Sequence, residues 1–192
     1  MNRVENVRGH ADYFVFDLEF IGNIQDLSTC RIWEISVFSL ATGAWFTTVV
    51  DPNPTTLVFP TPPVAELPHL TRTFLTTHQA QTWDVVLPQL IHWVAHQTRK
   101  LPIFISHNTF KADKPLLELE SKRYHRLLPL HWFFFDSLHF CRDVVHSSTG
   151  NFSLSGLHQQ LFQKPIPQAH RAKYDVLACT DILNKVTDAT WL

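Results

Sequence analysis

The chain has 192 residues, 45% hydrophobic and 17% charged, which excludes a disordered protein and allows one domain, residues 1–192, with a proper core. Its net charge of −1 gives no electrostatic argument for a nucleic-acid partner. No apolar run reaches membrane-spanning length, so we expect no membrane association. Three widely spaced cysteines favour an intracellular, reducing compartment, the cytoplasm or nucleus, and residues 1–10 are expected to be a flexible N-terminus.

The first strong pattern is an apolar run, Tyr13 to Phe20, that predicts a buried strand. Two acids interrupt it, and because Asp17 and Glu19 are two residues apart they project from the same face. Adjacent carboxylates there lose hydration and repel each other, which a bound Mg²⁺ or Mn²⁺ would relieve. Taken alone, however, Asp-x-Glu is better explained as an acidic strand end that runs into solvent.

Two further strands are predicted next, at 31–40 and 45–50, and they complete an antiparallel meander of three. Residues 51–82 contain six prolines and predict an irregular connection. A connection of this length is either functional or simply a stiffened surface loop.

Helical periodicity begins at Asp84 and continues to Lys100, and 101–106 then reads as a short buried strand. The next helix is expected to begin near Asp113, whose carboxylate should point the same way as the helix core face. That face is predicted to contain Leu116, Leu117, Tyr124, Leu127 and Leu128.

The last third predicts another strand at 132–135, ending in Asp136, which we expect to cap a helix or to support metal ligands. Ser153 is expected to cap a further helix, and a final helix begins near Ala172. Asp175 lies on the apolar stripe of that helix, a costly position unless the acid is paired or bound to metal. The predicted fold is α/β: a mixed five-stranded sheet, the antiparallel meander plus two parallel strands, covered by helices.

Four acids therefore have reasons to converge, and His170 lies five residues before the last of them. Four carboxylates and a histidine suit phosphodiester hydrolysis with two metals about 3.5–4 Å apart, in which the histidine takes a proton from the attacking water. The four acids are Asp17, Glu19, Asp113 and Asp175.

Three motifs in this order carry a resemblance to a known family: Asp17-Leu18-Glu19, His107-Asn108 followed by Asp113, and His170-Arg171-Ala172-Lys173-Tyr174-Asp175. They resemble the motifs of the DEDDh, or DnaQ-like, 3′–5′ exonucleases, which have the ribonuclease H-like fold. The second motif looks most like that of the three-prime repair exonucleases. The family often has this acid five residues after the histidine, where the chain has Ala112. Tyrosine-type relatives have a Tyr where this chain has Arg171, so the histidine type is the better match.

The resemblance implies a metal-dependent 3′–5′ exonuclease that hydrolyses single-stranded DNA or RNA to nucleoside 5′-monophosphates, with two Mg²⁺ or Mn²⁺ ions as cofactors. Asp17, Glu19 and Asp175 would bind the first metal and Asp17 would bridge to the second. Asp113 would hold the second metal directly or through water, and His170 would be the general base. A homodimer or a polymerase partner is also expected from relatives.

Four residues are candidates for substrate binding. Phe20 and Ile21 depart from the threonine-containing sequence that commonly follows the first motif, and they either contact the terminal base or belong to the core. His107 and Asn108 either position the second motif and touch substrate or form an ordinary corner after a strand. The main alternative function is a non-catalytic nucleic-acid-binding module or polymerase accessory subunit with the same fold; the acids could also be coincidental in a structural domain.

Overall fold

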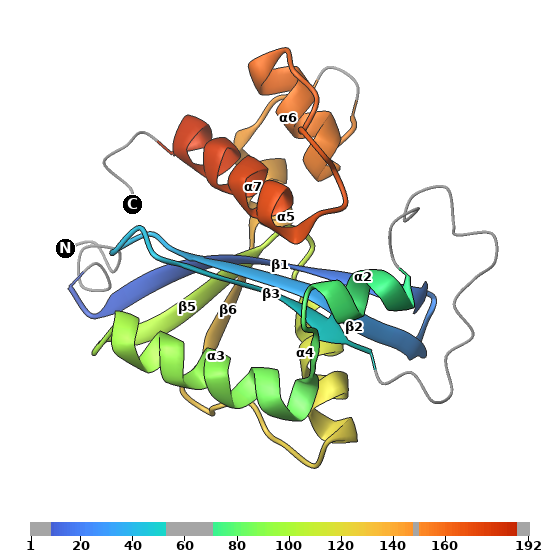
Figure 1. Cartoon of the computed structure of the whole chain (residues 1–192). Helices are drawn as coiled ribbons and strands as arrows, with labels where there is room; N and C mark the ends of the chain where they lie inside the picture. The colour runs from blue at the N-terminus through green and yellow to red at the C-terminus, as the bar shows by residue number, and fades with distance from the viewer. Residues whose placement is uncertain (1–8, 53–70, 148–149, 188–192) are drawn as a thin grey trace.

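A computed structural model describes residues 9–52, 71–147 and 150–187 and contains a six-stranded sheet in the order β4-β3-β2-β1-β5-β6 (Figure 1). β1 and β2 are antiparallel, as are β2 and β3, whereas β5 runs parallel to β1 and β6 parallel to β5. The strands are β1 (Ala11–Asn23), β2 (Asp26–Ser39), β3 (Trp45–Asp51), β4 (Gln81–Thr82), β5 (Leu101–Ser106) and β6 (Phe133–Asp136).

Helices cover both faces of the sheet (Figure 1). One face is covered by α3 and α4, and the other by α7 with α5 and α6 beyond it. The short α2 packs beside the ends of β1, β2 and β3. The helices are α2 (Arg72–Thr77), α3 (Trp83–Gln97), α4 (Asp113–Arg123), α5 (Ser137–Val144), α6 (Leu154–Phe162) and α7 (Ala172–Val186).

The alternation of β1 divides its side chains between these two layers. Phe14, Phe16 and Leu18 are buried in the main core cluster with residues of α3 and α4. Val15 packs on the opposite face in a cluster formed largely by α7. Because side chains alternate along a strand, Asp17 and Glu19 share the face of Val15 and lie under α7. The central strand thus buries its aromatic residues on one side and presents its acids to the other.

The predicted α/β class and mixed sheet covered by helices are confirmed. The structure adds a sixth strand, because β4 pairs in parallel with the end of β3 in a segment predicted to be irregular. The short α2 also lies in that segment, capped by the Thr71 hydroxyl. Residues 53–70 of the irregular connection predicted over 51–82 lie outside the described residues. So do residues 1–8, which make up most of the expected flexible N-terminus.

The predicted position of Leu127 on a helix core face is wrong. α4 ends at Arg123, and His125 then adopts a left-handed φ of 53°, which turns the chain out of the helix. Leu127 is therefore 84% exposed. β1 extends to Asn23 and β2 begins at Asp26, so only residues 24 and 25 connect these two strands.

Two further observations bear on the sequence predictions. In the described ranges no helix combines the length and the apolar character needed to cross a bilayer. The three cysteines, Cys30, Cys141 and Cys179, are buried free thiols rather than disulfide partners.

Candidate active site

Three carboxylates converge between the sheet and α7. Asp17 and Glu19 come from β1, and Asp175 comes from the first turn of α7. Each offers an oxygen, and these oxygens all lie within 4.8 Å of one another. Glu19 and Asp175 are buried and Asp17 is partly buried. Such a set of hard oxygen donors suits Mg²⁺ or Mn²⁺.

The packing of α7 explains how Asp175 reaches β1. Val176, Cys179 and Leu183 pack with Val15 of β1 and Ile105 of β5. Asp175 precedes Val176 in the first turn, so its carboxylate is carried to the sheet with the apolar stripe. The position that the sequence marked as costly is therefore occupied by a buried acid beside two others.

Burial and mutual repulsion raise the pKa values of these three acids above their ordinary range. Burial raises the pKa of Glu19 to about 9, and the charge of Asp175 and a hydrogen bond with it act in the same direction. Burial raises the pKa of Asp17 well above its ordinary value, followed by the charges of Asp113 and Glu19. Burial also raises the pKa of Asp175, although hydrogen bonds with Glu19 and the His170 backbone partly oppose it. A bound divalent cation would supply positive charge to compensate these carboxylates.

Asp113 lies beside the three-carboxylate group rather than inside it. It begins α4, is buried, and accepts a hydrogen bond from the Ser106 hydroxyl at 2.9 Å. Burial raises the pKa of Asp113 to about 7, against the lowering effect of the Ser106 hydrogen bond. Its charge is the largest of the neighbouring charges that raise the pKa of Asp17.

His170 lies at the rim of the same group. Its backbone N–H donates a hydrogen bond to Asp175 Oδ2 at 3.0 Å, and its φ is 67°. The residue is exposed, and its charge lowers the pKa of Asp175. An exposed imidazole can exchange protons with water.

The four residues predicted to bind substrate have different environments. Ile21 is 7% exposed and packs with Trp33, so its side chain offers no surface to a base. Phe20 is partly buried and packs against the main core cluster. The His107 ring nitrogens contact Ser137 Oγ at 3.0 Å and the Phe152 carbonyl at 2.8 Å. His107 thus connects the end of β5 with the first residue of α5 and with the segment before α6.

Asn108 and Asp136 together shape the loop that leads to Asp113. Asn108 adopts a left-handed φ of 72°, and its backbone N–H donates to Asp136 Oδ1 at 3.0 Å. Asp136 also accepts from the N–H groups of Phe110 and Leu138, and it caps α5. The predicted capping role of Asp136 is confirmed. Asn108 contributes its backbone to this arrangement and remains a candidate for substrate contact through its side chain.

Glu34 is a further buried acid beside this group, and it was not predicted as part of the site. It lies directly opposite Glu19 in the β1–β2 ladder and forms an ion pair with Arg171 at 2.9 Å. Its charge contributes to the raised pKa values of Asp17, Glu19 and Asp175. The signal in the sequence was an acid in a strand of otherwise buried apolar residues, which requires a partner.

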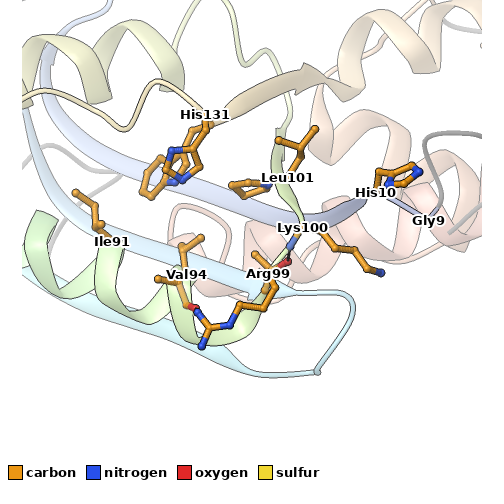
Figure 2. Close-up of a pocket in the computed structure, with 12 residues that line it drawn as sticks. Gly9, His10, Ile91, Val94, Arg99, Lys100, Leu101 and His131 are labelled. Carbon is orange, nitrogen blue, oxygen red and sulfur yellow. Dashed lines mark hydrogen bonds between the residues drawn. The ribbon is translucent and has the colours of Figure 1, made fainter.

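A cavity of about 790 Å³ lies away from this site, on the face of the sheet covered by α3 (Figure 2). Ile91 and Val94 of α3 line it, and Arg99, Lys100 and His131 surround it. None of the four predicted metal-binding acids is among its lining residues. The carboxylate group is therefore a separate feature on the opposite face.

Comparison with known proteins gives a fold but no sequence family: no family model and no curated protein matches the chain. Three solved structures of exonuclease I do match. A structure of exonuclease I concerned with its processivity has a TM-score of 0.71 at 13% identity, over 94% of this chain and 42% of that one. The chain has the fold of exonuclease I. This is the ribonuclease H-like fold predicted from the motifs.

Two of these structures contain single-stranded DNA. E. coli exonuclease I in complex with a dT13 oligonucleotide matches with a TM-score of 0.68 at 14% identity, over 94% of this chain and 42% of that chain. The zinc-bound form of the E. coli exonuclease I complex with single-stranded DNA has a TM-score of 0.70 at 14% identity. The match covers 94% of this chain and 41% of that chain. The chain thus spans less than half the length of each exonuclease I chain.

Proposed function

We propose that the protein is a metal-dependent 3′–5′ exonuclease that releases nucleoside 5′-monophosphates from single-stranded nucleic acid. The observation that carries the proposal is the convergence of Asp17, Glu19 and Asp175 within 4.8 Å. Three motifs that resemble those of DEDDh exonucleases and a fold shared with exonuclease I support it. The DNA complexes of exonuclease I make single-stranded DNA the first substrate to test, with RNA beside it.

The donor set fits two divalent cations, Mg²⁺ or Mn²⁺. Asp17, Glu19 and Asp175 would hold one, and Asp17 with Asp113 would hold the other. When bound, such cations supply positive charge to the scissile phosphate and to the attacking and leaving oxygens. The buried carboxylates, whose pKa values are raised by burial, are the residues that would give up their protons to hold this charge.

The remaining chemistry belongs to residues of the chain. His170 would accept a proton from the attacking water, and its exposed position allows the proton to pass on to solvent. Asp175 orients this residue by accepting its backbone N–H. Ser106 fixes the Asp113 carboxylate by donating a hydrogen bond to it. Phe20 and Asn108 are the candidates for contact with the terminal nucleotide.

The test is digestion of labelled single- and double-stranded DNA and RNA with Mg²⁺ or Mn²⁺, with the label at either end to read direction. We expect mononucleotides released from the 3′ end of single strands. Asp17→Asn and His170→Ala should each abolish most of this activity. Asp181→Asn is the matched control, because Asp181 is an exposed acid on α7.

Two results would overturn the proposal. Unchanged degradation by both variants would show that these residues are not catalytic. Tight binding of single strands without cleavage across several metals would instead support the non-catalytic nucleic-acid-binding or polymerase accessory role.

A further inference from the structure

The turn that carries His170 has an unusual backbone. The φ of His170 is 67°, in the left-handed region that residues other than glycine seldom adopt. One hydrogen bond, from its own N–H to Asp175, holds the turn from the α7 side. The residues directly after His170 are held from a different element of the fold, β2.

Glu34 of β2 accepts hydrogen bonds from both Arg171 and Ala172. Arg171 donates from Nε to Oε2 at 3.0 Å and from its terminal nitrogen to Oε1 at 2.9 Å, a two-pronged pairing of guanidinium and carboxylate. The backbone N–H of Ala172, the first residue of α7, donates to Oε2 at 3.1 Å. Glu34 is 1% exposed, and both of its oxygens are engaged. It is therefore occupied by the turn and unavailable as a metal ligand.

The position of Glu34 links this turn to the metal-binding strand. Glu34 is paired with Glu19 in the β1–β2 ladder, so the carboxylate that holds the turn and a carboxylate of the metal group are cross-strand neighbours. The Arg171 guanidinium also lies 5.7 Å over the ring of Phe74 from α2. Arg171 is thus fixed by a carboxylate and an aromatic ring, although its side chain is 28% exposed.

We propose that Glu34 and Arg171 are a positioning pair that holds the backbone on either side of the His170–α7 junction and keeps the imidazole beside the carboxylate group. Neither residue touches the reacting atoms. The inference rests on the proposed function, in which His170 accepts the proton from water. In this role Arg171 does not bind a substrate phosphate, and its ion pair with Glu34 does more than stabilise the fold.

A double-mutant cycle in activity separates these roles. We expect Arg171→Gln to lower kcat about 10- to 100-fold, as loss of a supporting contact commonly does, with KM changed less than about threefold. Arg171→Lys should recover little, because an ammonium group lacks the planar pairing geometry. Introduced into His170→Ala, the Arg171→Gln change should have no further effect. Lys173→Gln, which removes a positive charge from the same helical turn, is the matched control and should leave kcat unchanged.

Two outcomes of that cycle would overturn the proposal. A rise in KM with kcat unchanged would indicate that Arg171 binds a substrate phosphate. An equal loss of kcat in the wild-type and His170→Ala backgrounds would indicate that the pair does not act through His170.

Hydrogen exchange tests the positioning without any turnover. In Glu34→Ala, the amides of His170 and Ala172 should exchange at least about fivefold faster than in the wild type, while amides in the middle of α7 should not change. Arg171→Gln, which keeps the Glu34 carboxylate, provides a second and milder variant. Unchanged protection of both amides in both variants would refute the positioning role. A wild-type protein that cleaves nothing but shows the expected exchange would overturn only the proposed function.

Discussion

Replacing Glu19 by glutamine should stabilise the metal-free protein, and increasingly so as the pH rises. The folded-state pKa of Glu19 is about 9, against an ordinary value of 4.5, because the carboxyl is buried beside Asp175. Between pH 4.5 and pH 9 the folded protein binds more protons than the unfolded chain. The free energy of unfolding of the metal-free wild type is therefore highest below pH 4.5 and falls as the pH rises through 9. A glutamine removes this loss, and its amide can donate to Asp175 in place of the proton.

The magnitude follows from the linkage relation. One additional bound proton changes the free energy of unfolding by about 1.4 kcal/mol per pH unit. From pH 5 to pH 7 the wild type should therefore lose about 3 kcal/mol relative to Glu19→Gln. Groups distant from the site contribute equally to both proteins.

The assay is urea unfolding in EDTA at pH 5, 6, 7 and 8, followed by circular dichroism. Glu118→Gln is the control, because its half-exposed carboxylate on α4 should give a curve parallel to that of the wild type. Added Mn²⁺ should restore stability at pH 7 in the wild type and do less for Glu19→Gln. Parallel pH profiles for wild type and Glu19→Gln, or a wild-type profile that rises relative to the variant, would refute the reasoning.

Three other predictions test separate parts of the structure, two of them with a matched control substitution. Ser106→Ala should lower kcat/KM about 10- to 100-fold in a nuclease assay, because it releases the Asp113 carboxylate. Phe104→Ala should cost about 3–5 kcal/mol in urea unfolding because the side chain is fully buried, whereas Leu127→Ala, at an exposed position, should cost less than about 0.5 kcal/mol. Asp136→Ala should lower the free energy of unfolding by about 2–3 kcal/mol, because it leaves three backbone N–H groups without their acceptor. Asp136→Asn, which keeps an acceptor oxygen, should lose less.

The parts of the fold that depend on local periodicity were predictable. The alternation in β1 placed Phe16 and Leu18 on one face and Asp17 and Glu19 on the other, as the structure has them. The apolar stripe of α7 likewise predicted that Asp175 faces the sheet. Both predictions follow from side-chain spacing within one element, which needs no knowledge of its neighbours.

The parts that depend on tertiary pairing were not predictable. β4 has only two residues and exists because it pairs with β3, so no pattern within Gln81–Thr82 marks it as a strand. Leu127 fits the helical spacing of the preceding residues, but the left-handed turn at His125 ends that pattern. The partner of Glu34 lies 137 residues away, so the sequence shows a buried acid without showing that Arg171 compensates it.

The distribution of charge around β1 connects stability with the proposed chemistry. Five acids, Asp17, Glu19, Glu34, Asp113 and Asp175, lie close enough to influence one another, and among the described contacts Arg171 pairs only with Glu34. The other four have pKa values raised by burial, and protons and cations would compete for their oxygens. Since burial raises the pKa of Asp113 to about 7 and that of Glu19 to about 9, cation binding near neutral pH must displace protons and strengthen as the pH rises. The burial and mutual repulsion that raise the pKa values of these carboxylates would thus also favour the binding of a divalent cation.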